Sequence, residues 1–330
     1  MPYTLSDFDY HLPDKLIAQQ PATPRDHSRL LVYDRKSGTI RDDFFYNLHR
    51  HLPSETTLVI NNSKVEKARL LFGTREIFIT DQPDDRTAVA LVRPGRKFKA
   101  GQTVELTPQI HAEVQEVLDD GQRRLAFNLP LNDPGFDGYR LTPFPPYIRQ
   151  DENLAERYQT IFARHQGSKA APTAGLHFTD EVFASLEEKG IRKAEVTLHV
   201  GLGTFAPVKD ERLGNRLHSE QYEIDDRAAE LLNRARHITA VGTTSARVLE
   251  SSRITGSRFT TGKGRTDIYI KPGFEFKAVN ALVTNFHLPK STLLIMVAAL
   301  MGYEEMKKVY QHAIREQYRF YSFGDAMLIV

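Results

Sequence analysis

Residues 171–207 read APTAGLHFTDEVFASLEEKGIRKAEVTLHVGLGTFAP, and the rest of the chain is organised around this stretch. Thr179 is suited to cap a helix, acidic residues fill the first turn, and Gly190 follows the last turn. Apolar side chains recur between them at helical spacing, so we expect this helix to pack inward. Residues 191–200 then predict a strand that runs into a glycine-rich loop.

Two histidines flank this helix and strand. His177 follows Gly175 and precedes the helix, whereas His199 ends the strand and precedes Gly201 and Gly203. Glycine at such positions lets the backbone approach a ligand closely. A single histidine beside glycine is usually a hydrogen-bonded loop residue, but two in one short unit favour a functional site.

The composition is ordinary for a globular chain of 330 residues, with 40% hydrophobic and 26% charged residues. This length suggests two domains. The absence of cysteine excludes disulfides and thiolate chemistry, and the histidines form no His-x-x-x-His motif for a metal. We see no secretory signal and no apolar run long enough for a bilayer, so we expect a cytoplasmic protein with no membrane partner. The net charge of +2 permits a nucleic-acid partner without requiring one.

Segment 66–141 has a different character from its surroundings. Short β-rich pieces follow one another there, separated by turn sequences such as Asp-Asp-Gly and Pro-Gly, which predicts a small antiparallel β-barrel. Helical patterns lie on both sides of it, for example at residues 13–20 and 152–162. We therefore expect an α/β fold in which the barrel is inserted into a larger, discontinuous mixed α/β domain made of residues 1–65 and 142–330.

Polar residues follow the β-branched strand at residues 57–60, where Asn61, Asn62 and Lys64 occur. Asparagine at a strand end is common in turns for structural reasons alone. The carboxyl ends of strands in α/β proteins are also where ligand contacts lie. Both interpretations stay open for these residues.

A second strand, residues 238–241, is followed by Gly242, Thr243, Thr244 and Ser245 and then by a helix that bears Arg247. Free N–H groups at a helix N-terminus, the helix dipole and the hydroxyl groups together favour an anion or a carboxylate. Simple capping of the helix is the alternative. The spacing fits neither a Walker loop nor a Gly-x-Gly-x-x-Gly loop.

Seven motifs in this order resemble one family: AAPTAGLHFT, VTLHVGLGTF, HSEQY, VGTTSARVLES, TDIYIKPG, VTNFHLPKSTL and YRFYSFGDAM. The chain resembles the S-adenosylmethionine:tRNA ribosyltransferase-isomerases of queuosine biosynthesis from about Phe8 to Met327. The resemblance implies transfer and isomerisation of the ribosyl portion of S-adenosylmethionine onto an aminomethyl-deazaguanine at the tRNA wobble position. Epoxyqueuosine-tRNA, adenine and methionine are the implied products. The resemblance also implies an α/β domain with an inserted β-barrel.

That reaction implies a general base near the ribose C5′, a neutral amine nucleophile and a donor for the departing adenine. His177 or His199 is our expected base, with His218 and Glu220 as the other candidates. The segment from Gly242 to Ser245, with Arg247, would hold the methionine carboxylate or a tRNA phosphate. On chemical grounds we expect Asp267, Asn285 and His287 to line the adenine or ribose side and Arg319 and Asp325 to orient the site. We expect further substrate contacts at Asn61, Asn62, Lys64, Thr173, Gly175, Gly201 and Gly203.

The implied partners are S-adenosylmethionine, which is a consumed substrate, and tRNA with a modified wobble base. We expect no metal, no separate cofactor and a monomer. The sequence departs from the family pattern at Lys64, Asn215, Arg265 and Lys271, where arginine, histidine, tryptophan and tyrosine are usual. The alternative is therefore a catalytically impaired paralogue that binds S-adenosylmethionine or RNA without transfer.

Overall fold

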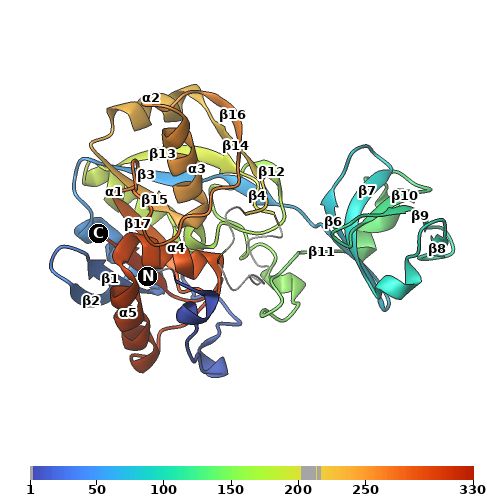
Figure 1. Cartoon of the computed structure of the whole chain (residues 1–330), viewed down its shortest axis with the longest axis horizontal. Helices are drawn as coiled ribbons and strands as arrows, with labels where there is room; N and C mark the ends of the chain where they lie inside the picture. Colours follow the sequence, from blue (N-terminus) through green and yellow to red (C-terminus); the bar gives the residue numbers. More distant parts are fainter. Residues whose placement is uncertain (1–2, 202–212, 214–216) are drawn as a thin grey trace. The chain divides into compact units, whose positions relative to one another are not determined.

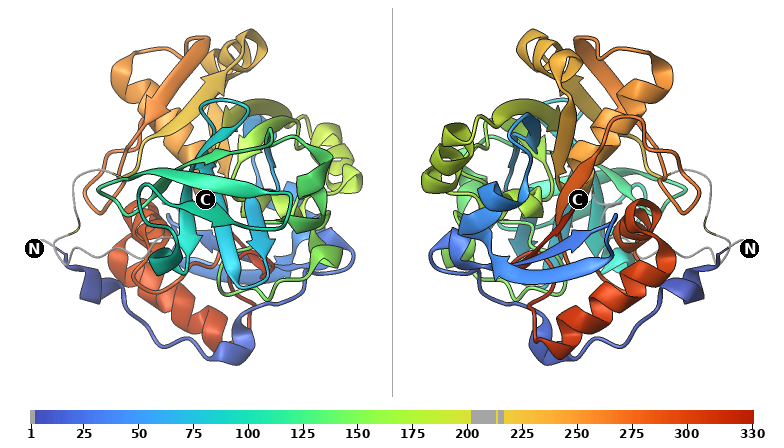
Figure 2. Two further views of the ribbon diagram at one scale, coloured as in Figure 1. Left: turned by 90° about the vertical axis from the view of Figure 1, so that its right-hand side faces the viewer. Right: turned by 90° about the vertical axis from the view of Figure 1, so that its left-hand side faces the viewer.

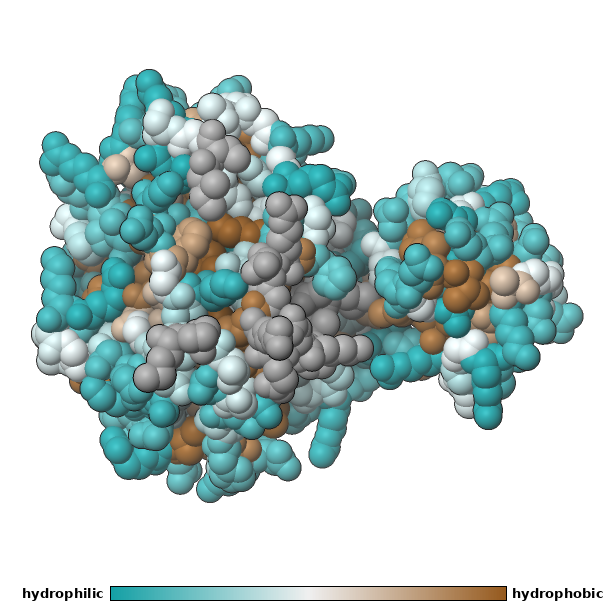
Figure 3. All heavy atoms as spheres, in the orientation of Figure 1, coloured by the Kyte–Doolittle hydropathy of each residue, from teal (hydrophilic) through white to brown (hydrophobic). Residues whose placement is uncertain are grey.

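A computed structural model of the chain describes residues 3–201, 213 and 217–330 (Figure 1). The chain divides into two compact units. Unit 1 consists of Met1–Lys64 and Pro145–Val330, and unit 2 consists of Val65–Phe144. Hydrophilic side chains cover much of the visible surface of each unit (Figure 3).

Unit 1 is built on a nine-stranded mixed sheet. Its strands, in spatial order, are β16 (Gly262–Thr266), β14 (Glu220–Ile224), β13 (Arg192–Leu198), β3 (Thr56–Asn61), β15 (His237–Val241), β17 (Ala281–Asn285), β18 (Ala326–Ile329), β1 (Arg29–Asp34) and β2 (Thr39–Phe44). The four strands β13, β3, β15 and β17 run parallel to one another. Their carboxyl ends therefore meet at one edge of the sheet, where α/β proteins place ligand sites.

Helices cover both faces of this sheet (Figure 2). The α-helices are α1 (Asp180–Glu188), α2 (Asp226–Arg234), α3 (Gly242–Thr255), α4 (Thr292–Met301) and α5 (Tyr303–Arg315). Helices α2 to α5 pack with Val59 and alternate residues of the other strands, whereas α1 packs on the opposite face with Leu58 and Ile60. The alternation of these neighbours on β3 reflects the two-residue repeat of a strand.

Short 3-10 helices and one small ribbon complete the chain. The 3-10 helices are η1 (Leu5–Phe8), η2 (Asp14–Leu16), η3 (Arg25–His27), η4 (Phe45–His51), η5 (Gly95–Lys97), η6 (Pro134–Tyr139), η7 (Glu152–Leu154) and η8 (Thr173–His177). The ribbon pairs β12 (His165–Ser168) with β4 (Ser63–Val65). None of the helices in the described residues is long and apolar enough to cross a bilayer.

The helix signals of the central stretch are confirmed. Thr179 Oγ1 accepts a hydrogen bond from the Val182 N–H at 3.3 Å and so caps α1. Gly190 follows the helix with a φ of +80°, a conformation that favours glycine. Asp225 caps α2 in the same way, with 2.7 Å between its Oδ1 and the Ala228 nitrogen.

Unit 2 is a curled antiparallel sheet of seven strands. In spatial order they are β11 (Arg140–Leu141), β5 (Arg69–Phe72), β6 (Arg75–Asp81), β7 (Thr87–Arg93), β10 (Arg123–Phe127), β9 (His111–Val117) and β8 (Thr103–Glu105). The strands predicted for this segment are thus confirmed. They enclose a separate apolar core that includes Phe98, Leu125 and Phe136.

Two predicted helices are wrong. Segment 13–20 forms only η2, and segment 152–162 forms only η7 followed by turns. In the second segment the backbone carbonyls serve another partner, because the Arg25 guanidinium donates to the carbonyl oxygens of Glu156 and Gln159. Tertiary contacts therefore override the helical pattern there.

Candidate active site

The carboxyl ends of β15 and β17 and the helix η8 enclose two small cavities of about 30 Å³ each. Thr173, Asn285 and His287 line both cavities. The first is also lined by Gly242, Thr243 and Thr244. Six of the sequence-predicted residues therefore come together in unit 1, although they are spread over more than a hundred positions of the chain.

The Asn285 side chain fixes the state of His177. Asn285 Nδ2 lies 3.2 Å from the Tyr321 carbonyl oxygen, which can only accept, so this atom is the amide nitrogen. The same nitrogen donates to His177 Nε2 at 3.1 Å. The proton of the neutral ring is then on Nδ1, which lies 2.8 Å from Ser28 Oγ and donates to it. Both ring nitrogens of His177 are thus engaged.

Burial keeps His177 neutral. The ring is 4% exposed and packs against the Phe45 ring at 5.1 Å between centroids. Desolvation, together with the smaller effect of the charges of Arg319 and Arg25, lowers the pKa of His177 to about 3. The Asn285 Oδ1 atom is buried without a hydrogen-bond partner, so it is an acceptor available to a ligand group.

His287 is held by its backbone and by one ring nitrogen. Its N–H donates to the Tyr310 hydroxyl at 3.1 Å, and its carbonyl oxygen accepts from the Tyr10 hydroxyl. Its Nε2 lies 2.7 Å from Thr284 Oγ1. Burial lowers the pKa of His287 to about 3, so the ring is neutral at physiological pH.

The N-terminus of α3 forms the other wall of the first cavity. Gly242 adopts a φ of +83° and begins the helix directly after β15. The hydroxyl oxygens of Thr244 and Ser245 are buried without hydrogen-bond partners. Unpartnered hydroxyls beside the free N–H groups of a helix N-terminus suit an anionic ligand.

One turn into α3, Arg247 is buried and forms an ion pair with Glu220. The other oxygen of Glu220 accepts from the Gly201 N–H at 2.8 Å. Nε and Nη2 of Arg247 are buried without hydrogen-bond partners. A buried guanidinium whose N–H donors are not all used can bind a carboxylate or phosphate.

His199 lies apart from these cavities. Its neighbour Val200 lines the first cavity, whereas His199 lines an open hollow of about 230 Å³ together with Thr197, Gln221 and Arg265. Gly167 packs against the His199 ring, because a Cβ on that glycine would lie 3.0 Å from the ring Nδ1. The structure therefore separates the two histidines that the sequence placed in one unit.

The two asparagines after β3 are used within the protein. Asn61 Oδ1 accepts from the N–H groups of Ser63 and Leu198, and its Nδ2 donates to the Leu198 carbonyl. Asn62 donates to Glu195 and accepts from Thr197. These amides tie β3 to β13. Lys64, by contrast, is exposed.

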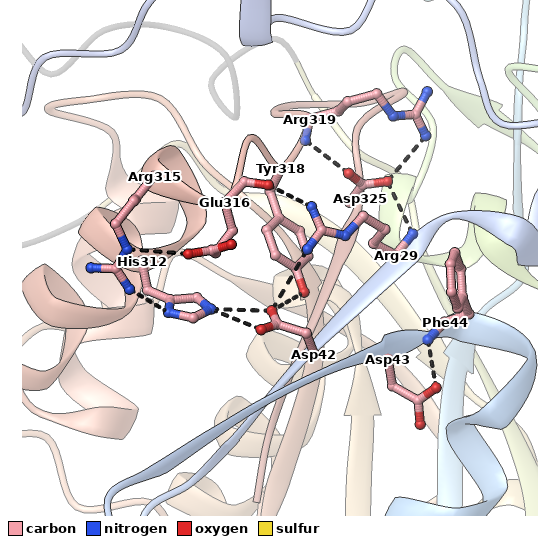
Figure 4. Close-up of polar contacts among 10 residues, drawn as sticks. All are labelled: Arg29, Asp42, Asp43, Phe44, His312, Arg315, Glu316, Tyr318, Arg319 and Asp325. Carbon is pink, nitrogen blue, oxygen red and sulfur yellow. Dashed lines mark hydrogen bonds and ion pairs between the residues drawn. The ribbon is translucent and has the colours of Figure 1, made fainter.

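Arg319 and Asp325 close the C-terminal loop (Figure 4). Asp325 is buried, and its carboxylate accepts from the N–H of Arg319 at 2.8 Å, from the Arg319 guanidinium at 3.1 Å and from the N–H of Arg29 at 3.1 Å. Arg319 is 36% exposed at its side chain. Beside them, the Asp42 carboxylate accepts from the Tyr318 hydroxyl at 2.5 Å.

The remaining candidates have different surroundings. His218 is exposed and Asp267 is half-buried. Gly175 is buried so tightly that a Cβ would meet the Phe162 ring at 2.7 Å. Gly203 lies outside the described residues, as does Asn215.

Several residues of the site were not predicted from the sequence. Ser28, Thr284, Tyr10 and Tyr310 hold the two buried histidines. Ser28 is 149 positions from His177, so no local signal could have linked them. Only the VTNFH motif, which contains Thr284, offered a hint. Within the described residues no cluster of three or more histidine or acidic side chains could hold a metal ion.

The fold and the site define an α/β protein with a buried polar ligand site at the carboxyl edge of its sheet. A family model described as "Queuosine biosynthesis protein" matches residues 5–329. The chain belongs to this family.

Curated relatives with similar sequences carry names that agree with this family. Two proteins named S-adenosylmethionine:tRNA ribosyltransferase-isomerase, from Desulfitobacterium hafniense and Carboxydothermus hydrogenoformans, are each 46% identical over 99% of this chain and 99% of their own. One of the same name from Finegoldia magna is 44% identical over 98% of this chain and 97% of its own. The crystal structure of an S-adenosylmethionine tRNA ribosyltransferase from Thermotoga maritima is 37% identical, with a TM-score of 0.59, over 98% of this chain and 100% of that one.

Proposed function

We propose that this protein is an S-adenosylmethionine:tRNA ribosyltransferase-isomerase. It transfers the ribosyl portion of S-adenosylmethionine to the aminomethyl group of a deazaguanine at the tRNA wobble position and isomerises it to epoxyqueuosine. Adenine and methionine leave. The observation that carries this conclusion is the 46% identity to enzymes of that name over 99% of the chain.

The buried anion site at α3 supports a place for the methionine carboxylate. A negative group there can accept hydrogen bonds from the hydroxyls of Thr244 and Ser245 and from Nε and Nη2 of Arg247. The helix dipole adds a favourable electrostatic interaction. We assign the ribose or adenine side to Asn285 Oδ1 at the end of β17, to His287 and to Asp267. In this arrangement His177 is a positioning residue, since it holds Asn285.

We assign the general base to His199. His177 Nε2 already accepts a hydrogen bond, and the carboxylate of Glu220 is paired with Arg247. His199 lines an open hollow beside the cavity, and this position is the reason for the assignment. His218, which is exposed, is the second candidate.

S-adenosylmethionine is consumed as a substrate in this proposal, and no separate cofactor or metal is required. We place the enzyme in the cytoplasm, where its tRNA substrate is, and propose that it acts as a monomer. We further propose that unit 2, which follows Lys64 and ends at Phe144, is an inserted barrel domain, because residues on both sides of it belong to unit 1.

The test is incubation with S-adenosylmethionine and tRNA that carries the aminomethyl-deazaguanine. We expect adenine release, with epoxyqueuosine in the digested tRNA. S-adenosylmethionine binding without either product would instead support the impaired paralogue, and Lys64 and Arg265 would then be reverted to the residues usual in the family.

A further inference from the structure

A polar face lies on the three strands at one edge of the unit 1 sheet. Residues paired directly across neighbouring strands point to the same side. The pairing of β13, β14 and β16 places two rows of side chains on one face, with Thr197, Glu223 and Lys263 in the first row and His199, Gln221 and Arg265 in the second. We call these six residues the edge face. They line the hollow of about 230 Å³ described above.

Two cations of the edge face are available to a partner. Lys263 is 83% exposed at its side chain, and its Nζ lies 3.8 Å from the Glu223 carboxylate, beyond hydrogen-bond distance. Arg265 donates through Nε to Ser219 Oγ at 3.0 Å. Its two terminal amino groups have no hydrogen-bond partner among the residues that the structure describes. They can therefore bind an anion in a bidentate manner.

The positive character continues along the same side of β13. Lys193, Glu195 and Thr197 occupy every second position of β13, so they point to the same side. Glu195 is paired with both Lys193 and Arg164. The ion pairs of this surface hold Lys193, Arg164 and Lys263 with Glu195 and Glu223, Arg265 adds a further positive charge, and Asp180, Glu187 and Arg227 also act on Lys193.

The edge face borders the candidate active site. His199 belongs to the edge face, and the next residue, Val200, lines the buried cavity at the carboxyl ends of the parallel strands. A polymer that lay along the edge face would therefore lead from Lys263 and Arg265 towards the site.

We propose that the edge face binds the anticodon arm of the tRNA, with Lys263 and Arg265 holding backbone phosphates. This inference rests on the proposed function and adds the docking surface to it. Phosphate contacts by exposed lysine and arginine fix the register of an RNA without reading its sequence. The imidazole and amide of His199 and Gln221 lie in the same row and suit the edges of unstacked loop bases, which is how proteins read single-stranded RNA.

The experiment measures the dissociation constant of a fluorescently labelled anticodon stem–loop RNA for the whole protein at several salt concentrations. The test variant carries Lys263→Glu and Arg265→Glu. We expect its dissociation constant to rise at least about tenfold near 0.1 M salt. We call the slope of the logarithm of the binding constant against the logarithm of the salt concentration the salt slope. Its magnitude should fall by about 1.5 in the test variant, because each lost phosphate contact removes about 0.7 to 0.9 from it. S-adenosylmethionine affinity should stay unchanged.

A matched control exists at the far edge of the same sheet. Lys36 and Arg41 are exposed in the hairpin that ends with β2, the strand at the opposite edge from β16. Lys36→Glu with Arg41→Glu changes the net charge by the same amount. We expect its salt slope to match that of the unaltered protein. Lys263→Arg with Arg265→Lys keeps both charges and should retain most of the RNA affinity.

The outcomes are distinct. Equal weakening by both charge-reversed pairs would mean that net charge alone attracts RNA, and the edge face would be rejected. Unchanged binding in the test variant would reject it as well, while adenine release from modified tRNA would still support the proposed function. If the unaltered protein bound no RNA and released no adenine, the proposed function itself would fail.

Discussion

Arg247 on α3 and Glu220 on β14 form an ion pair in which each side chain is less than a tenth exposed. The two partners differ in how many of their hydrogen-bonding atoms are used. Glu220 is also bonded to the Gly201 N–H, whereas Arg247 keeps Nε and Nη2 without partners. Glu220 thus compensates the charge of Arg247 and orients it, while part of the guanidinium stays available to an anion.

We expect Arg247→Met to lower the free energy of unfolding by about 3–5 kcal/mol, because it leaves the Glu220 carboxylate buried without its counter-charge. Combining it with Glu220→Gln should restore most of that loss. Chemical denaturation of the two single variants and the double variant measures the coupling. S-adenosylmethionine affinity should remain weak in the double variant, since its guanidinium is gone. A double variant as unstable as Arg247→Met would show that the charge is not the cause.

The two histidines of the central stretch should respond differently to substitution. His199→Asn is expected to lower kcat for adenine release by about 10²–10⁴-fold, as loss of a general base does, with a changed pH–rate profile. His177→Asn should preserve that profile, because the His177 ring affects the substrate only by holding Asn285. Single-turnover measurements with saturating S-adenosylmethionine would make the comparison. If His177→Asn abolished the acidic limb of the pH–rate profile and His199→Asn did not, the two roles would be exchanged.

Asp325 and Arg319 bond to each other, but substitutions of the two residues should differ in their effect on stability. Asp325→Ala removes the acceptor for two backbone N–H groups and a guanidinium in a buried place, so we expect a loss of about 3 kcal/mol in the free energy of unfolding. Arg319→Ala should cost less than about 1 kcal/mol, because its side chain is 36% exposed. Urea denaturation of both variants provides the test. Equal losses would contradict the backbone role of Asp325 drawn in Figure 4.

Acid should destabilise the protein through its buried histidines. Burial lowers the pKa of His177 and of His287 to about 3, against about 6.5 in an unfolded chain. The folded protein then binds fewer protons than the unfolded chain between these two values. The stability from each neutral ring is therefore complete above pH 6.5 and is lost as the pH falls towards 3.

Denaturation midpoints between pH 8 and pH 4.5 would measure this loss. Each histidine contributes a slope of up to about 1.4 kcal/mol per pH unit below pH 6.5. His287→Asn should remove one such contribution. His218→Asn is the matched control, because its side chain is exposed, and it should leave the slope unaltered. A slope that did not change in His287→Asn would mean that this ring is protonated in the folded protein.

Local signals in the sequence predicted the elements that depend on local chemistry. The cap at Thr179 and the short strands of unit 2 were predicted because turn residues and side-chain periods act over a few positions. The Gly242 turn was readable for the same reason. The false helix at residues 152–162 failed because Arg25, far away in sequence, binds its carbonyl groups.

The site itself was predicted only in part. The motifs that contain Thr173, Gly242 and Asn285 were identified, and these residues do line one cavity. The joint role of His177 and His199 could not be judged, because their separation depends on the course of the chain past the end of β13 at Leu198. Val200 lines the buried cavity, whereas His199 lines the open hollow beside it. Ser28, the partner of His177, carried no signal at all.

The position of β18 in the sheet has a consequence for the synthesis of the protein. This strand, made of residues 326–329, lies between β17 and β1, so β1 and β2 reach the rest of the sheet only through it (Figure 2). The hairpin of β1 and β2 is therefore synthesised well before β18, and it has no strand to join until residues 326–329 have been made. Until then the edge of the hairpin is unpaired, and an unpaired edge strand can pair with other chains.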